Sequence, residues 1–127
     1  MMALTPPVSG CAALLTDAQA QVAADALTYS AVALRMLNAV AEKHIDSLDL
    51  PTPEQLEQAA SIVRDLRSAR HELELAEHDM RNDEVEYARA HARDAVVYMQ
   101  GATDTLKQLG ADVSAVQTAL NFASRFL

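Results

Sequence analysis

Apolar residues recur along this chain at helical spacing, and this period constrains the fold more than any other feature. In one segment they step by three and four residues without a break, at Val85, Ala88, Ala92, Ala95, Met99, Ala102, Leu106 and Leu109. Such spacing places them all on one side of an α-helix. Alanine, the strongest helix former, supplies 25 of the 127 residues, against three glycines and four prolines. The sequence therefore predicts an all-α protein and excludes a turn-rich β-sandwich or barrel.

The first predicted helix is apolar around most of its circumference. We expect it to begin at Thr16 or Asp17, both good N-caps, and to end near His44 or Ile45. Between residues 18 and 41 only two side chains are charged. A helix of this kind is buried on more than one side, so it is either the central helix of a bundle or part of a subunit interface.

Capping and turn residues separate the remaining helices. Thr52 and Gln55 are spaced as a capping box at the start of the second helix, with a proline between them. Asn82 is expected to cap the third helix after a tight turn, and a helix that continues through this point is the alternative. Gly110 is expected to end the third helix. Asp112 then caps a last helix of about 15 residues, near the length at which an isolated helix is marginal.

Short connections between long helices make neighbours antiparallel. We therefore predict a single domain over residues 1–127, an antiparallel up-down helical bundle of three long helices and one short C-terminal helix. Residues 1–15 are expected to form a loose N-terminal tail.

Charge and cysteine content restrict the partners and the compartment. Eighteen acids against ten bases give a net charge of −8, which opposes binding to nucleic acid or anionic membrane and favours a basic or hydrophobic protein partner. A single cysteine, Cys11, cannot form an internal disulfide. The segment Val8–Cys11 is similar to a bacterial lipoprotein cleavage box, but no Lys or Arg precedes it and two prolines interrupt the apolar stretch. We expect a cytoplasmic protein, and no motif calls for a cofactor.

One face of the second helix carries the densest polar chemistry. His71, Glu74 and His78 share a side on which a metal ion could bind, since residues three and seven apart face the same way. The core residues of this helix lie on the opposite side, so the face is expected to be solvated. A row of exposed ion pairs is the simpler interpretation, and no metal site is predicted here.

The same face contains Arg64 and, seven residues later, His71. This pair resembles the Arg-x(4–6)-His signature of HEPN-type ribonucleases, which are also small helical bundles. The resemblance implies metal-independent RNA cleavage with Arg64 and His71 as catalytic residues, and it is the alternative hypothesis for function.

The preferred hypothesis is a non-enzymatic protein–protein interaction module, such as an adaptor, a secretion chaperone or an immunity-type binder, and we expect a homodimer. The features that favour it are the very apolar first helix, the short fourth helix and an aromatic flank on the third. Tyrosines at the edge of a bundle are common contact residues. The predicted binding residues are Tyr87, His91 and Tyr98 on the third helix, with Tyr29 and Met36 on the first.

Overall fold

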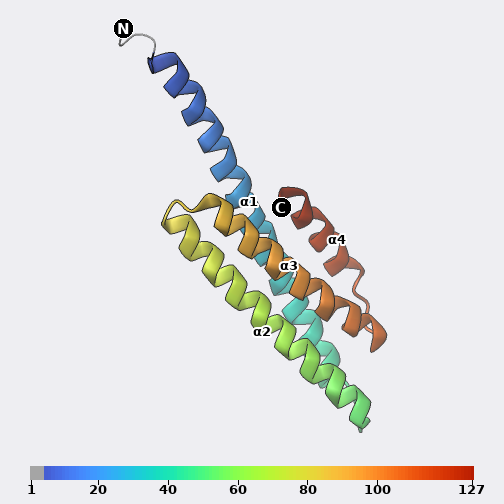
Figure 1. The fold of residues 1–127 in the computed structure, drawn as a ribbon. Coiled ribbons are helices and arrows are strands. Elements are labelled where there is room, and N and C mark those ends of the chain that lie inside the picture. The colour runs from blue at the N-terminus through green and yellow to red at the C-terminus, as the bar shows by residue number, and fades with distance from the viewer. Residues whose placement is uncertain (1–4) are drawn as a thin grey trace.

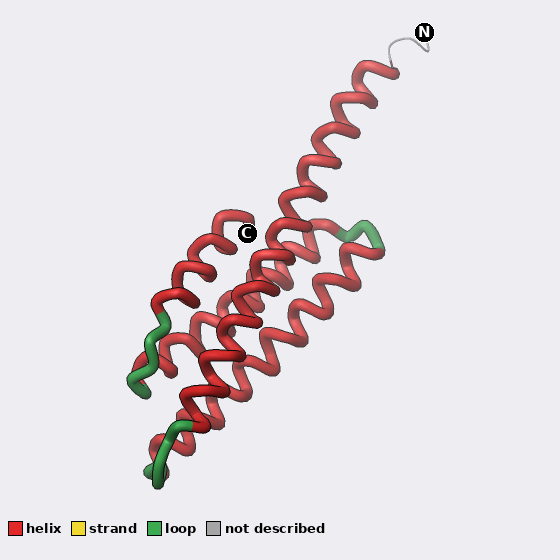
Figure 2. The backbone as a smooth tube through the Cα atoms, turned by 180° about the vertical axis from the view of Figure 1, so that it is seen from behind, coloured by secondary structure: helices red, strands yellow, loops and turns green. Residues whose placement is uncertain are grey.

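The computed structural model describes residues 5–127, with side chains from residue 14 onward, and it is an antiparallel bundle of four α-helices (Figures 1 and 2). The helices are α1 (Thr5–Asp46), α2 (Pro53–Arg81), α3 (Val85–Gln108) and α4 (Ser114–Ala123), followed by a single 3₁₀ turn, η2 (Ser124–Phe126). The described residues contain no strand. The predicted all-α architecture of three long helices and one short one is therefore confirmed. None of the described helices combines the length and the apolar composition that crossing a membrane requires.

The start of α1 differs from the prediction. The helix begins at Thr5 and not at Thr16 or Asp17, so residues 5–15 are helical and not a loose tail. The two prolines that follow Thr5 lie in the first turn, where backbone N–H groups have no intrahelical partner and proline is tolerated. Residues 1–4 of the expected tail, and the side chain of Cys11, lie outside what the structure describes.

The start of α2 has the predicted cap. The Oγ1 of Thr52 accepts a hydrogen bond from the amide of Gln55 at 3.1 Å, and the Gln55 side chain accepts one from the amide of Thr52 at 2.9 Å. These two bonds complete the capping box and satisfy two amides that the helix itself leaves free.

The turn between α2 and α3 is present, but Asn82 does not cap α3 as predicted. Asn82 is instead the C-cap of α2, directly after Arg81, and Asp83 follows it in the left-handed region with φ of 58°. The amide of Glu84 then donates to the carbonyl of Asp79 at 2.8 Å, and that of Asp83 to the carbonyl of Met80 at 3.2 Å. This pattern is a Schellman motif, in which the left-handed residue is usually glycine.

The C-terminal end of α3 and the N-terminal end of α4 lie close to their predicted positions. Gly110 has φ of 91°, and its amide and that of Ala111 donate to carbonyls in the last turn of α3, at 3.0 Å each. Asp112 does not occupy the cap position of α4 as predicted, because Val113 is the N-cap and Asp112 lies one residue before it. Its Oδ1 accepts hydrogen bonds from the amide and the hydroxyl of Ser114, at 3.1 and 2.8 Å. These bonds hold the pKa of the Asp112 carboxyl below its usual value of 3.8, chiefly through the backbone bond.

The core follows the predicted apolar rows. α2 and α3 form a closely packed hairpin, α1 lies against both, and α4 packs on α1 and α3 (Figure 1). Small and large residues alternate in this core. Its fully buried large side chains are Leu37, Ile62, Met99, Leu106 and Leu120. The fully buried alanines include Ala69 and Ala76 on α2 and Ala88, Ala92 and Ala95 on α3.

Candidate functional site

The N-terminal part of α1 extends beyond the rest of the bundle. Figures 1 and 2 both show it continuing past the α2–α3 turn and past the end of α4. From residue 14 to residue 22 every side chain is exposed except that of Ala20, which is half-buried. The first buried residue on this helix is Ala23. Eight of these nine residues therefore have exposed side chains that no neighbouring helix covers.

Three large, partly exposed apolar side chains recur at intervals of seven residues along α1, from its uncovered part into the bundle. Leu15 is 67% exposed, Val22 is 37% exposed and Tyr29 is 36% exposed. A spacing of seven is close to two helical turns, so the three lie along one side of α1, as the a positions of a coiled coil do. We call Leu15, Val22 and Tyr29 the α1 row.

An aromatic cluster forms where the α1 row meets the C-terminal end of the chain. The ring of Tyr29 stacks on that of Phe126, with centroids 5.1 Å apart, and meets the edge of Phe122 at 4.7 Å. The guanidinium of Arg125 lies over the Phe122 ring, 5.4 Å from its centroid. Such arrangements are favoured beyond the area they bury. Tyr29, a predicted contact residue, therefore also anchors α4 and η2 against α1, which the sequence analysis did not anticipate.

The other predicted contact residues lie in different surroundings. Met36 is half-buried and packs against the hydrophobic core, so it is less accessible than expected. Tyr87 and Tyr98 are exposed on α3, at 66% and 39%. His91, from the same flank, is held in a polar network between α3 and α2.

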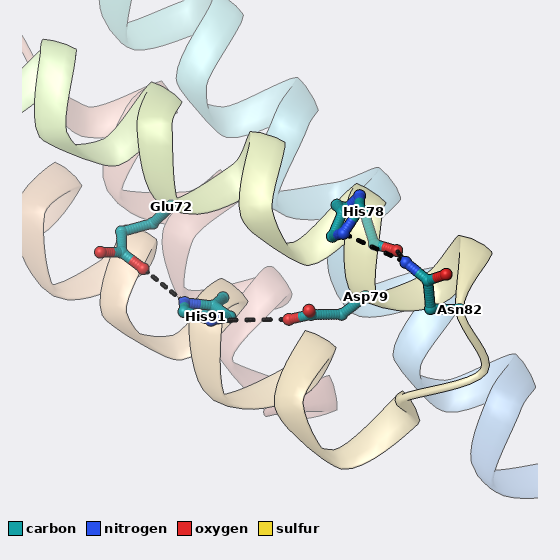
Figure 3. A network of polar contacts seen from close by, with 5 residues as sticks. All are labelled: Glu72, His78, Asp79, Asn82 and His91. Atoms are coloured by element: carbon teal, nitrogen blue, oxygen red, sulfur yellow. Dashed lines mark hydrogen bonds and ion pairs between the residues drawn. The ribbon is translucent and has the colours of Figure 1, made fainter.

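The imidazole of His91 lies between two carboxylates of α2 (Figure 3). Its Nδ1 is 2.7 Å from Oε2 of Glu72, and its Nε2 is 3.5 Å from Oδ2 of Asp79. Glu72 and Asp79 are seven residues apart, so both reach toward α3 from the same side of α2. The Oδ2 atom of Asp79 is buried and has no hydrogen bond among the described residues.

Asp94 completes a group that could hold a metal ion. One ligand atom from each of Glu72, His91 and Asp94 lies within 4.8 Å of the others. Asp94 is three residues after His91 on α3, which puts the two side chains on the same face. It is exposed, whereas Glu72 and His91 are half-buried.

The three residues of α2 that the sequence analysis considered as metal ligands do not converge on one metal site. His71, Glu74 and His78 do not belong to the one group of potential metal ligands found among the described residues. The Oε1 of Glu74 accepts a hydrogen bond from Arg70 at 3.2 Å. The carbonyl of His78 accepts one from the Asn82 side chain at 2.9 Å, and the ring Nε2 of His78 lies 3.2 Å from the same amide. These contacts are local, within one turn of the helix.

Arg64 and His71 are likewise both exposed and two helical turns apart on α2. The hollow beside Arg64, about 390 Å³, is lined by Glu54 and Glu57 among others and does not include His71. The structure therefore does not bring the two residues of the ribonuclease signature into one cavity within this chain.

Sequence reasoning missed Glu72 and Asp79 as partners of His91. Glu72 directly precedes the buried Leu73, and Asp79 directly precedes the half-buried Met80. This position at the edge of the apolar row was the only available signal. Comparison with known proteins identifies no relative, since no protein-family model, curated protein or solved structure matches this chain.

Proposed function

We propose that this chain is a non-enzymatic protein-interaction module that pairs with a second copy of itself through the α1 row. The observation that carries the proposal is that Leu15 and Val22 are exposed, at heptad spacing, on a helix that extends beyond the bundle. Adaptors, secretion chaperones and immunity-type binders are the protein classes with this character, and we place the module in the cytoplasm.

The uncovered part of α1 gains stability from a partner. Isolated helices shorter than about 12–15 residues are marginal in water, because most helical stability in proteins comes from packing of an apolar face. Full burial of a leucine or valine side chain contributes about 1.5–3 kcal/mol. Leu15 is 67% exposed and Val22 is 37% exposed. Burying the exposed part of these two side chains against a second copy would therefore contribute part of that free energy to association.

An antiparallel pairing of two α1 helices suits the charges on this segment. Asp17 and Asp25 are the only charged residues between residues 5 and 34, and Oδ1 of Asp25 accepts a hydrogen bond from Gln21 at 3.0 Å. If Leu15 of one copy faces Val22 of the other, Asp25, which flanks the α1 row three residues after Val22, lies level with residue 12, an alanine. A parallel pairing would bring the two copies of Asp25 level with each other. Two-fold, self-complementary contacts of the antiparallel kind are also the commonest in soluble oligomers.

The test is sedimentation equilibrium of the full chain over a range of concentrations. We expect the wild type to sediment as a dimer, twice the chain mass of 13.7 kDa. The double variant Leu15→Gln/Val22→Gln should weaken association at least tenfold, because glutamine keeps the helix propensity and removes the apolar contact. Leu56→Gln/Val97→Gln is the matched control, since it changes exposed apolar residues on α2 and α3 and should leave the dimer intact.

A wild-type monomer at high concentration, or a dimer that tolerates the Leu15/Val22 change, would overturn the proposal.

The ribonuclease alternative has its own test. It requires that the purified chain cleaves RNA without a metal and that both Arg64→Ala and His71→Ala abolish the cleavage.

A further inference from the structure

We propose that Glu72, His91 and Asp94 bind a divalent transition metal ion, for which we take Zn²⁺, and that Asp79 positions the histidine. This site is independent of the α1 row. It lies between α2 and α3, and it differs from the His71, Glu74 and His78 set considered from the sequence.

The donor set and its spacing suit the ion. Zn²⁺ is bound by imidazole nitrogen and carboxylate oxygen at about 2.0–2.2 Å, so tetrahedral ligands stand about 3.4 Å apart. The present Nδ1–Oε2 separation of 2.7 Å, between His91 and Glu72, needs to open by a fraction of an ångström. The Asp94 carboxylate, within 4.8 Å of both, needs to approach by about 1 Å or a little more. Side-chain rotation accommodates both changes, because Asp94 is exposed.

Binding moves the ring hydrogen of His91 from one nitrogen to the other. In the ion-free state the neutral ring donates Nδ1–H to Glu72. In the metal-bound state Nδ1 is a ligand and the single ring hydrogen, exchanged through solvent without net release, is on Nε2, which faces the buried Oδ2 of Asp79 at 3.5 Å. A carboxylate behind a metal-bound histidine fixes the tautomer and the orientation of the ring.

The carboxylate of Asp79, which faces the Nε2 atom of His91, supports the same site. Its side chain is only 13% exposed, and Oδ2 has no hydrogen bond among the described residues although an imidazole stands in front of it. A buried carboxylate oxygen without a hydrogen bond is costly. The Nε2–H of a metal-bound His91 would supply that bond over a slightly shorter distance. The His91 ring itself is 32% exposed, so a fourth ligand position is open to water.

The experiment is isothermal titration of the full chain with ZnCl₂, in a Cys11→Ser/His71→Gln/His78→Gln background that removes the cysteine of α1 and both histidines of α2. We expect one ion per chain. Asp94→Asn, at an exposed position, should weaken binding at least tenfold without affecting the fold. Asp79→Asn should weaken it about 10–100-fold although every direct ligand is retained. Asp104→Asn, an exposed aspartate farther along α3, is the matched control and should bind as the background does.

A second readout reports the geometry. Co²⁺ bound in place of Zn²⁺ should give the visible absorption of a low-coordinate nitrogen–oxygen site, and Asp79→Asn should shift that spectrum. No heat and no spectrum in the background protein would overturn the proposal, as would binding that persists unchanged in Asp94→Asn. Circular dichroism of each variant establishes that a loss of binding is not a loss of fold.

Discussion

Ser30 offers the sharpest test of how the bundle is held together, because it places a polar group in the core without a partner. Its side chain is fully buried on α1, and its Oγ makes no hydrogen bond among the described residues. An unsatisfied buried hydroxyl costs about 1–3 kcal/mol. Replacing serine by alanine also gains about 0.5 kcal/mol of helix propensity. The small void left by one oxygen atom offsets part of this, so Ser30→Ala should stabilise the fold by about 1–2 kcal/mol.

Thr103→Val is the matched control for this change. Thr103 is also buried, but its Oγ1 donates to the carbonyl of Met99 at 2.7 Å. Valine keeps the shape and removes a satisfied hydrogen bond, so this variant should lose about 0.5–1.5 kcal/mol. Urea unfolding of both variants and the wild type, at one protein concentration, measures the two differences. A Ser30→Ala protein no more stable than the wild type would refute the reasoning and show that the hydroxyl is paired in solution.

Two further predictions concern helix ends. Thr52→Ala removes one half of the capping box of α2 and should lower the free energy of unfolding by about 1 kcal/mol in the same urea assay, whereas no loss would show that the cap is dispensable. Asp112 has a pKa lowered in the folded state by its bonds to Ser114, so its stabilisation is present above the unfolded value of 3.8 and is lost as pH falls through the lower folded value. The wild type should therefore exceed Asp112→Asn in stability near neutral pH, and the two should converge in acid. A constant gap would exclude this linkage.

Most of the fold could be predicted from local patterns. The apolar rows of α2 and α3, the Thr52 capping box and the left-handed Gly110 each depend on residues within one or two helical turns. The start of α1 could not be predicted in this way. Thr16 and Asp17 are good N-caps and determine the predicted start, although the two prolines nearer the N-terminus are compatible with the first turn of a helix.

The candidate sites were harder to predict because they depend on contacts between helices. His91 and Tyr29 were both identified as surface residues of interest, but their neighbours Glu72 and Phe126 come from other helices. The turn at Asp83 determines which residues of α2 face His91. Asp83 has a left-handed conformation there, and the sequence has no glycine at this position to indicate it. A shift of one residue in that turn would rotate Glu72 and Asp79 away from His91.

The small residues between α2 and α3 connect the packing of the bundle to the polar network at its edge. The distance between packed helices, about 8–10 Å, is set by the side chains at the contact. On α3 the row facing inward begins with the fully buried Ala88, Ala92 and Ala95, and α2 contributes Ala69 and Ala76. Alanine permits a close approach but buries less apolar area than leucine, so this core gives up some hydrophobic stabilisation. In return, the carboxylates of Glu72 and of the shorter Asp79 on α2 come within reach of His91 across the interface. If a second copy binds α1 as proposed, or an ion binds between α2 and α3, each would add to the stability of this core, because a ligand that binds only the folded chain stabilises it.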